Sequence, residues 1–218
     1  MGNKTALFSQ HQPGGVFTIQ DMLEHPKSIY FVDSAIGVDT AGNGSSPDKP
    51  WATVAYAYSS AIPVSGDVIY VMPGHAETIA TTAGIASNIA GVKVVGLGWG
   101  AKRPTFTFSA TGSSWTISGA STYLKNIRVT SSVNELVSMY APTGADVTFD
   151  GVDYIDPGAA KETIQFILTT TAAARLTVKN CVHYASTAAA SAQRWIYLVA
   201  VDQARILNNT FILKLFDH

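Results

Sequence analysis

An internal repeat of uneven length runs through most of this 218-residue chain. Similar segments recur at steps of 30, 25, 29 and 28 residues, and they begin at Val94, Leu124, Phe149, Val178 and Ile206. A looser copy begins at Val71. Uneven steps of this size favour a solenoid with loops of variable length over a propeller or a leucine-rich array. We therefore predict an all-β fold, a parallel β-helix, with six turns in this alignment.

The third position of the repeat holds only glycine and asparagine, in the order Gly96, Asn126, Gly151, Asn180 and Asn208. These two residues most readily accept a left-handed backbone conformation, which a sharp turn between strands requires. A β-sandwich of short strands is the competing architecture, and it would not explain this column. The column therefore predicts a turn at the same place in each coil.

The first and second positions are expected to face opposite ways, because neighbouring residues of a strand point to opposite sides. The first position is apolar in every copy and is predicted to stack inside the solenoid. The second position holds Lys125, Asp150 and Lys179 in successive copies. It therefore predicts an outward ladder of alternating charge, which contributes little energy at a surface but fits the register.

The two ends of the chain differ from the repeat. Residues 1–28 form a polar arm with an apolar cluster over residues 16–23, which is expected to dock on the domain or on a neighbour. The rest, residues 29–218, is predicted to be a single domain that opens with a strand over residues 29–32. Apolar residues at helical spacing over residues 50–62 predict a short helix that caps the N-terminal end. Residues 211–216 are strand-like without a following cap, so a partner, a longer chain or a loop is expected to cover that end.

Charge and hydropathy patterns exclude several classes of partner. The chain has 14 basic and 15 acidic residues and a net charge of -1, so no basic surface for nucleic acid is expected. The uncharged stretch over residues 104–124 alternates apolar with Ser and Thr, which predicts strands rather than a membrane span. No apolar segment of signal-peptide length opens the sequence.

Three runs resemble a known family: YFVD at residues 30–33, GNGSSPDKPWAT at residues 42–53 and GDVIYVMPGHAETI at residues 66–79. They resemble the opening module of right-handed parallel β-helix proteins of the pectin-lyase-like superfamily. The run HPKSIYFVD at residues 25–33, together with VMPGHAE, is most similar to virion proteins of tailed bacteriophages that decorate or cement capsids. The close resemblance covers about residues 25–100. The same superfamily contains polysaccharide lyases, hydrolases and phage depolymerases, so the resemblance implies a fold more specifically than an activity.

Carboxylates are the first candidates for chemistry, because carbohydrate hydrolases use a pair of them roughly 5 to 9.5 Å apart. In the outward columns Asp150 lies between two lysines and Asp153 lies beside Arg128, so no two carboxylates are expected to stack. The cluster of Asp146, Asp150, Asp153 and Asp156 is the best remaining candidate for an acid pair or a calcium site. Turn residues and surface charges explain it more simply, with an ion pair between Arg128 and Asp153.

The remaining candidates are predicted to be structural. His75 and Glu77 follow a Pro-Gly turn, which predicts a solvated loop. His183 falls in an apolar column and is expected to be packed, and Cys181 is expected to be a buried small hydrophobe that cannot form an internal disulfide. None of the five histidines lies at metal-ligand spacing from another. The loop at Asp33, Asp39, Asn43 and Asp48 offers carboxylate and amide oxygens, so calcium binding in this loop is left as an open alternative.

These patterns predict no catalytic residue, no metal and no cofactor. Together with the resemblance, they predict a non-enzymatic bacteriophage structural protein that binds the capsid exterior as a decoration or cement subunit. Its partners would be the major capsid protein or another virion protein, with further copies in a dimer or trimer, and neither nucleic acid nor membrane. It would be made in the host cytoplasm and end on the capsid surface. The alternative is a tail-associated glycan-binding module, or a polysaccharide depolymerase or lyase, on the same fold.

Overall fold

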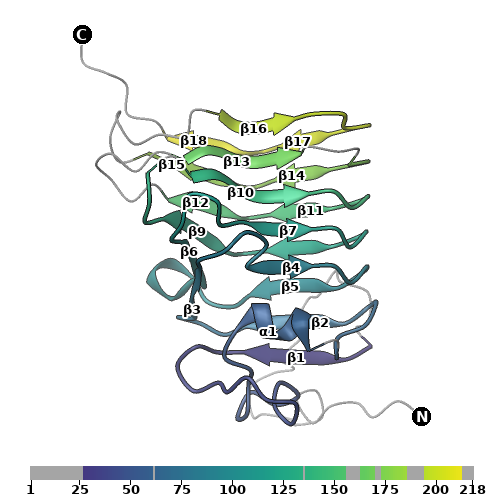
Figure 1. Cartoon of the computed structure of the whole chain (residues 1–218), viewed down its shortest axis with the longest axis vertical. Helices are drawn as coiled ribbons and strands as arrows, with labels where there is room; N and C mark the ends of the chain where they lie inside the picture. The colour runs from purple at the N-terminus through teal and green to yellow at the C-terminus, as the bar shows by residue number, and fades with distance from the viewer. Residues whose placement is uncertain are drawn as a thin grey trace, which may run out of the picture.

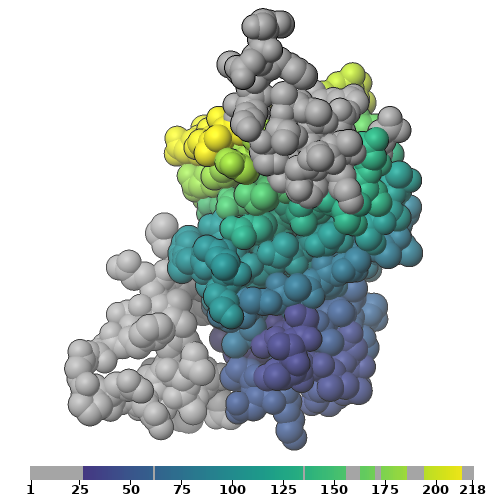
Figure 2. All heavy atoms as spheres, turned by 90° about the vertical axis from the view of Figure 1, so that its left-hand side faces the viewer, coloured from purple at the N-terminus to yellow at the C-terminus, as the bar shows by residue number. Residues whose placement is uncertain are grey.

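The computed structural model describes residues 27–60, 62–134, 136–155, 163–169, 173–185 and 194–212. These residues form a right-handed parallel β-helix, as the sequence predicts, with three sheets that run along the solenoid axis (Figure 1). In Figure 2 the residue colours run from purple and blue near one end of the solenoid, through teal and green, to yellow near the other end. No helix within the described ranges is long and apolar enough to cross a membrane.

From β2 onward the chain visits the three sheets in rotation, whereas β1 adds a strand to one sheet only and the last described coil contributes to two sheets. The seven-stranded sheet consists of β1 (Ile29–Val32), β2 (Val68–Val71), β5 (Lys93–Gly96), β8 (Tyr123–Lys125), β11 (Thr148–Asp150), β14 (Thr177–Lys179) and β17 (Arg205–Leu207). The six-stranded sheet consists of β3 (Ala76–Ile79), β6 (Thr105–Phe108), β9 (Arg128–Ser131), β12 (Asp153–Ile155), β15 (Val182–Tyr184) and β18 (Thr210–Ile212). The five-stranded sheet consists of β4 (Ile85–Ser87), β7 (Trp115–Ile117), β10 (Leu136–Pro142), β13 (Thr163–Thr169) and β16 (Arg194–Leu198).

The register confirms the predicted repeat over most of its length. One column of paired residues runs through Val94, Leu124, Phe149, Val178 and Ile206. The alignment of the looser copy is displaced by two residues, because Ile69, and not Val71, lies opposite Val94. A slip of two residues leaves the same faces inside and outside, so apolar alternation does not reveal it. The strand β1, which sequence alone placed before the repeat, pairs with β2 and starts the same sheet.

Left-handed residues form the predicted column at the corner that follows the seven-stranded sheet. The φ angles are 54° at Asn126, 64° at Gly151, 55° at Asn180 and 52° at Asn208. Gly96 is the exception, since its backbone is not left-handed. A Cβ atom at Gly96 would lie only 2.2 Å from the carbonyl oxygen of Asn126, so this glycine is needed for close approach of two coils.

A second left-handed column, which the sequence analysis missed, lies at the corner that precedes the same sheet. It contains Ser121, Asp146, Arg175 and Gln203, with φ angles of 55°, 58°, 55° and 61°. Each lies five residues before a member of the Gly/Asn column. Backbone hydrogen bonds of 2.7 to 2.8 Å link these residues to the next coil, from Ser121 N–H to Ala145, from Asp146 N–H to Ala174 and from Arg175 N–H to Asp202. These bonds stabilise a conformation that is unfavourable for residues other than glycine and asparagine.

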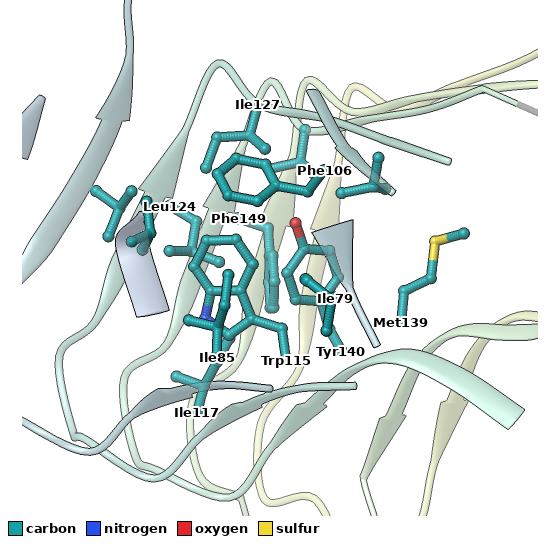
Figure 3. Packing of buried hydrophobic residues seen from close by; sticks show 14 of the residues in the cluster. Ile79, Ile85, Phe106, Trp115, Ile117, Leu124, Ile127, Met139, Tyr140 and Phe149 are labelled. Atoms are coloured by element: carbon teal, nitrogen blue, oxygen red, sulfur yellow. The ribbon is translucent and has the colours of Figure 1, made fainter. Parts of the chain in front are cut away.

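The interior is filled by aromatic and branched side chains from all three sheets (Figure 3). Tyr140 lies near the centre, with its ring 5.6 Å from Trp115, 4.9 Å from Phe149 and 5.4 Å from Phe166. Trp115 in turn lies 5.0 Å from Phe106. These distances are in the range of favourable offset and edge-to-face ring packing. Apolar packing therefore continues from coil to coil along the axis.

The predicted helix is shorter than its apolar pattern, because α1 spans Val54–Ser59 and not residues 50–62. Trp51 belongs to an extended segment that bridges to Val32, next to β1. Thr53 then acts as the N-cap, and its hydroxyl accepts a hydrogen bond of 3.0 Å from the N–H of Tyr56. The helix packs against β4, the first strand of the five-stranded sheet (Figure 1), and so covers part of the N-terminal end as expected.

Candidate functional site

The predicted acidic cluster is divided over two corners and two faces of the solenoid. Asp146 lies in the left-handed column before β11, Asp150 ends β11, and Asp153 begins β12 on the neighbouring sheet. Asp156 lies outside the described residues. Within the described part of the chain, no three His, Cys, Asp or Glu side chains are grouped so that they could hold a metal ion. The three described carboxylates therefore do not form a single site.

Each of these carboxylates has protein partners. Arg175 donates two hydrogen bonds of 2.6 Å to Asp146. Asp150 accepts from the Tyr123 hydroxyl and, at 2.8 Å, from Asn180, and it lies 3.3 Å from the Lys179 ammonium. The ladder predicted from Lys125, Asp150 and Lys179 is thus present in register, with the ion pair to Lys179.

The partner of Asp153 differs from the expected one. Arg128 lies opposite Asp153 in the register, but the ion pair is formed by Arg103. Arg103 directly follows the short 3₁₀ helix η2 (Gly100–Lys102), and it reaches along the outside of the sheet over β9. Its longer reach could not be inferred from residues aligned one coil apart. Asp153 therefore joins two coils that are not adjacent.

The environments of these carboxylates shift their pKa values in opposite directions. Burial alone would raise the pKa of Asp150, but hydrogen bonds from Tyr123 and Asn180 and the charge of Lys179 outweigh it and lower the pKa. Burial raises the pKa of Asp153, and the charges of Arg103 and Arg128 offset only part of the rise. The hydrogen bond from Arg175 lowers the pKa of the exposed Asp146. A half-buried acid with a raised pKa is a candidate proton donor. The Asp153 carboxylate, however, is already engaged in an ion pair with Arg103.

The histidine and acid after the Pro-Gly turn are buried, which corrects the expectation of a solvated loop. The His75 side chain is fully buried, and its Nδ1 accepts a hydrogen bond of 3.0 Å from the N–H of Ser34. Its Nε2 lies 3.2 Å from the Glu77 carboxylate. Glu77 also accepts from the N–H groups of Val54 and Ala55, at 2.7 and 3.1 Å. The pair therefore fastens the loop after β1 and the start of α1 to β3.

The other predicted structural residues have the expected surroundings. His183 is buried, stacks on Tyr154 at 4.7 Å between ring centroids, and has its pKa lowered to about 4 by burial. Cys181 is buried, its thiol donates to the carbonyl of Lys179 at 3.2 Å, and burial raises its pKa to about 12. A thiol with so high a pKa is a poor nucleophile. Both residues pack the interior.

The oxygen-rich loop before α1 uses its side chains to hold its own backbone. Asp39 accepts hydrogen bonds from the N–H groups of Ala52 and Thr53, at 2.8 and 3.1 Å. Asp33 accepts from the N–H of Ala35 at 2.8 Å, and Asn43 donates to the carbonyl of Val38 at 3.0 Å. These contacts explain the polar composition of the loop without a cation.

A groove of about 400 Å³ lies beside β3 and the start of α1. Small and hydroxyl-bearing side chains form most of its lining, among them Ser34, Thr53, Ala55, Thr78, Ala80 and Thr81. We call this hollow the edge groove, because β3 is the first strand of its sheet and its unpaired side faces the hollow. Glu77 also lines the groove, but its carboxylate is engaged by α1 and His75.

The opposite end of the solenoid exposes several large apolar side chains. The final strands of the three sheets are β16, β17 and β18. Large apolar side chains on or beside them are between 38% and 50% exposed, namely Tyr197, Val199, Ile206, Leu207, Phe211 and Ile212. We call this surface the C-terminal face. Trp99, at 76% exposure the most exposed large apolar side chain described, lies elsewhere, on the loop before η2.

No family model and no curated protein matches the chain. A solved structure of a rhamnogalacturonan lyase does match, with a TM-score of 0.52 and 16% sequence identity. The two proteins share a fold. The match covers 75% of this chain and 43% of the lyase chain, so the present chain spans less than half of that protein. At this identity the comparison shows the shared parallel β-helix fold alone, and no activity can be inferred from it.

Proposed function

We propose that the protein is a non-enzymatic structural subunit of a bacteriophage particle and binds the capsid exterior as a decoration or stabilising subunit. The C-terminal face is the observation that carries this proposal, because several exposed large apolar side chains at the end of a solenoid favour contact with another protein. The choice of a phage particle rests on the sequence resemblance of residues 25–100. The major capsid protein is the proposed partner, with dimers or trimers of the subunit on the shell.

The surroundings of the acidic residues support a structural role over the alternative of polysaccharide cleavage. Asp146, Asp150 and Asp153 each have a cationic partner, and Glu77 has three donors. Retaining and inverting glycosidases need two carboxyl groups that both face the scissile bond. Asp146, Asp150 and Asp153 instead connect coils, so they favour a scaffold.

The proposed mechanism is stabilisation by mass action. A subunit that binds the assembled shell, and not its separated parts, shifts the equilibrium toward the shell. At a free concentration one hundred times the dissociation constant, each occupied site adds about 2.7 kcal/mol. Burial of the C-terminal face would supply the binding energy through removal of apolar surface from water.

Binding to particles that lack the subunit tests the proposal. We expect the purified protein to sediment with capsids of the phage that encodes it, at many copies per particle, and to raise the temperature at which they release DNA. The variant Leu207→Asp/Ile212→Asp should bind at least about tenfold more weakly, because it charges the C-terminal face. Val38→Asp, at a position 55% exposed near the other end, is the matched control and should bind normally.

Three results would contradict the proposal. The first is a monomeric protein that fails to sediment with any capsid. The second is a location at the tail in few copies, which would favour a glycan-binding module. The third is release of reducing ends or unsaturated sugars from capsular polysaccharide, abolished by Asp150→Ala or Asp153→Ala, which would favour a depolymerase or lyase.

A further inference from the structure

The first strands of the three sheets differ in what lies beside them at the N-terminal end of the solenoid. The loop before α1 covers β1, through hydrogen bonds from Phe31 N–H to Gly44 and from Trp51 N–H to Phe31. The helix α1 packs against β4. The strand β3, the lowest of its sheet in Figure 1, has no strand paired on that side within the described part of the chain. The first coil therefore contributes no strand to the six-stranded sheet.

Hydrogen bonds between β3 and β6 show which backbone groups of β3 face its free edge. The N–H of Thr105 donates to the carbonyl of His75 at 2.9 Å. The N–H of Ser109 likewise donates to the carbonyl of Ile79 at 2.9 Å. Odd-numbered residues thus pair with β6. In a parallel ladder the residues between them direct their N–H and C=O groups to the opposite side.

The free edge of β3 presents the backbone groups of Ala76, Thr78 and Ala80. The N–H of Ala76 confirms this direction, because it donates to the hydroxyl of Ser34 at 2.9 Å. The N–H groups of Thr78 and Ala80 and the carbonyls of all three residues have no hydrogen-bond partner among the described residues. The two free donors are two residues apart, about 6.6 Å along the strand. A second strand repeats its carbonyls at the same interval, so these groups match an extended backbone better than a compact ligand.

The edge groove has room for a strand at this position. Its volume of about 400 Å³ lies along Ala76, Thr78 and Ala80, and its lining also includes the small side chains of Ala52 and Ala55. Short side chains allow another backbone to approach a sheet edge closely. The shape of the groove is therefore compatible with an added strand.

The charge in the groove restricts what such a strand can carry. Glu77 is the one charged residue in the described lining. Its carboxylate accepts hydrogen bonds from the first two N–H groups of α1 and lies 3.2 Å from Nε2 of His75. A charged side chain on an incoming segment would lose water without gaining a free counter-charge. The groove therefore favours an uncharged segment.

We propose that the edge groove binds an extended, uncharged segment of a partner protein as an added strand beside β3. Exposed strand edges are templates for pairing with another chain. The added strand would complete the first coil of the six-stranded sheet through main-chain hydrogen bonds, which provide affinity largely independent of the partner's sequence. The groove lies at the opposite end of the solenoid from the C-terminal face, so this site can be tested independently of the proposed attachment to capsids.

Amide hydrogen exchange of the full chain with a model peptide tests the proposal. The probe is the uncharged peptide acetyl-Thr-Val-Thr-Val-Thr-amide, whose residues favour an extended backbone. At about 5 mM peptide we expect the amides of Thr78 and Ala80 to exchange about fivefold or more slowly, because a bound strand protects them. Glu77 and Ile79, whose amides face β6, should keep their rates and report that β3 remains folded.

Two variants and a modified peptide separate backbone pairing from side-chain contact. Thr78→Pro removes one free N–H, and proline is tolerated on an edge strand where that N–H faces away from the sheet. This variant should abolish the slowing at Ala80. Thr78→Val, the matched control, keeps the N–H and the side-chain shape and should retain the slowing. A peptide with every backbone nitrogen methylated cannot donate to β3, so it should leave both amides of the wild-type protein unchanged.

Unchanged exchange of Thr78 and Ala80 at about 5 mM peptide would overturn the proposal. Equal slowing by the methylated peptide, or undiminished slowing in Thr78→Pro, would overturn it as well. Slow exchange of both amides without any peptide would also count against a partner strand. In that case, protection that rises with protein concentration over about a hundredfold range would show that a second copy fills the groove. Protection independent of concentration would show that the chain covers its own edge.

Discussion

His75 and Glu77 are two residues apart on β3 and its preceding turn, and they share one buried hydrogen bond of 3.2 Å that anchors the N-terminal segment. Because the N–H of Ser34 donates to Nδ1 of His75, the imidazole proton is on Nε2 and is donated to Glu77. The Glu77 carboxylate also accepts hydrogen bonds from the first two backbone N–H groups of α1. The loop, the helix and the first strand of the six-stranded sheet are thus fixed by one pair of side chains.

Replacement of this carboxylate should destabilise the N-terminal end. In Glu77→Gln the amide group has one acceptor oxygen for three donors, and a buried N–H loses its partner. We expect the free energy of unfolding to fall by about 1 to 3 kcal/mol in urea denaturation. Asp48→Asn, at an exposed position, is the control and should change stability by less than about 0.5 kcal/mol. Equal stability of the two variants would show that the pair is dispensable.

Asp150 and Asp153 should affect acid stability in opposite directions. The pKa of Asp150 is lowered in the folded protein, so the stability it adds is present above its ordinary value of 3.8 and is lost as the pH falls through the folded pKa. The pKa of Asp153 is raised, so acidification through that pKa favours the folded state. Chemical denaturation between about pH 6 and pH 2 should show a shallower acid loss in Asp150→Asn and a steeper one in Asp153→Asn than in wild type. Slopes that change in the same direction would refute the assigned environments.

His183 should make the C-terminal coils sensitive to mild acid. Burial lowers its pKa to about 4 from 6.5, so the unfolded chain takes up a proton before the folded chain does. Stability is therefore lost as the pH falls from about 6.5 to about 4, by roughly 2 kcal/mol. His183→Phe keeps a ring on Tyr154 and removes the titration, so its unfolding midpoint should change less than that of wild type between pH 7 and pH 4.5. A wild-type midpoint that is flat over this range contradicts the prediction.

The coil register could be inferred from sequence because two columns have restricted chemistry. Only Gly and Asn occur at the first corner, and the apolar column from Val94 to Ile206 keeps the same spacing. The second corner repeats with the same steps, but Ser121, Asp146 and Arg175 share no residue type. Backbone bonds to the next coil, and not side-chain preference, determine their left-handed conformation. No residue type in the sequence marks this corner, and only the structure shows that it lies five residues before each Gly or Asn.

The contacts of single residues were harder to infer than the register. Sequence alignment identifies neighbours one coil apart, which places Arg128 beside Asp153 but cannot show that Arg103 reaches over β9. The burial of His75 depends on the loop at Ser34, 41 residues earlier, which no periodic pattern connects to β3. Long loops that fold back on the first coil therefore limit what repetition can predict.

Asn126 offers the sharpest test of the Gly/Asn column, because it combines a left-handed φ of 54° with two side-chain hydrogen bonds. Its Nδ2 donates to the carbonyls of Gly96 and Gly98, at 2.8 and 3.0 Å, and so ties two coils together. Asn126→Gly keeps the backbone conformation and loses the bonds, which should cost about 1 to 2 kcal/mol. Asn126→Ala also adds left-handed strain and should cost about 1 kcal/mol more.

Asn208, with a φ of 52° on the last described coil, separates the two effects. No hydrogen bond of its side chain is present among the described residues, so Asn208→Gly should be nearly neutral, whereas Asn208→Ala should cost about 1 kcal/mol from strain alone. Urea denaturation of the four variants measures both differences. If the Gly and Ala variants are equally stable at both positions, left-handed geometry is not the reason for the column. If the Ala variant is less stable than the Gly variant at both positions, and only Asn126→Gly is costly relative to wild type, the backbone conformation restricts the residue type. Hydrogen bonding then explains why asparagine is present at position 126 and not glycine.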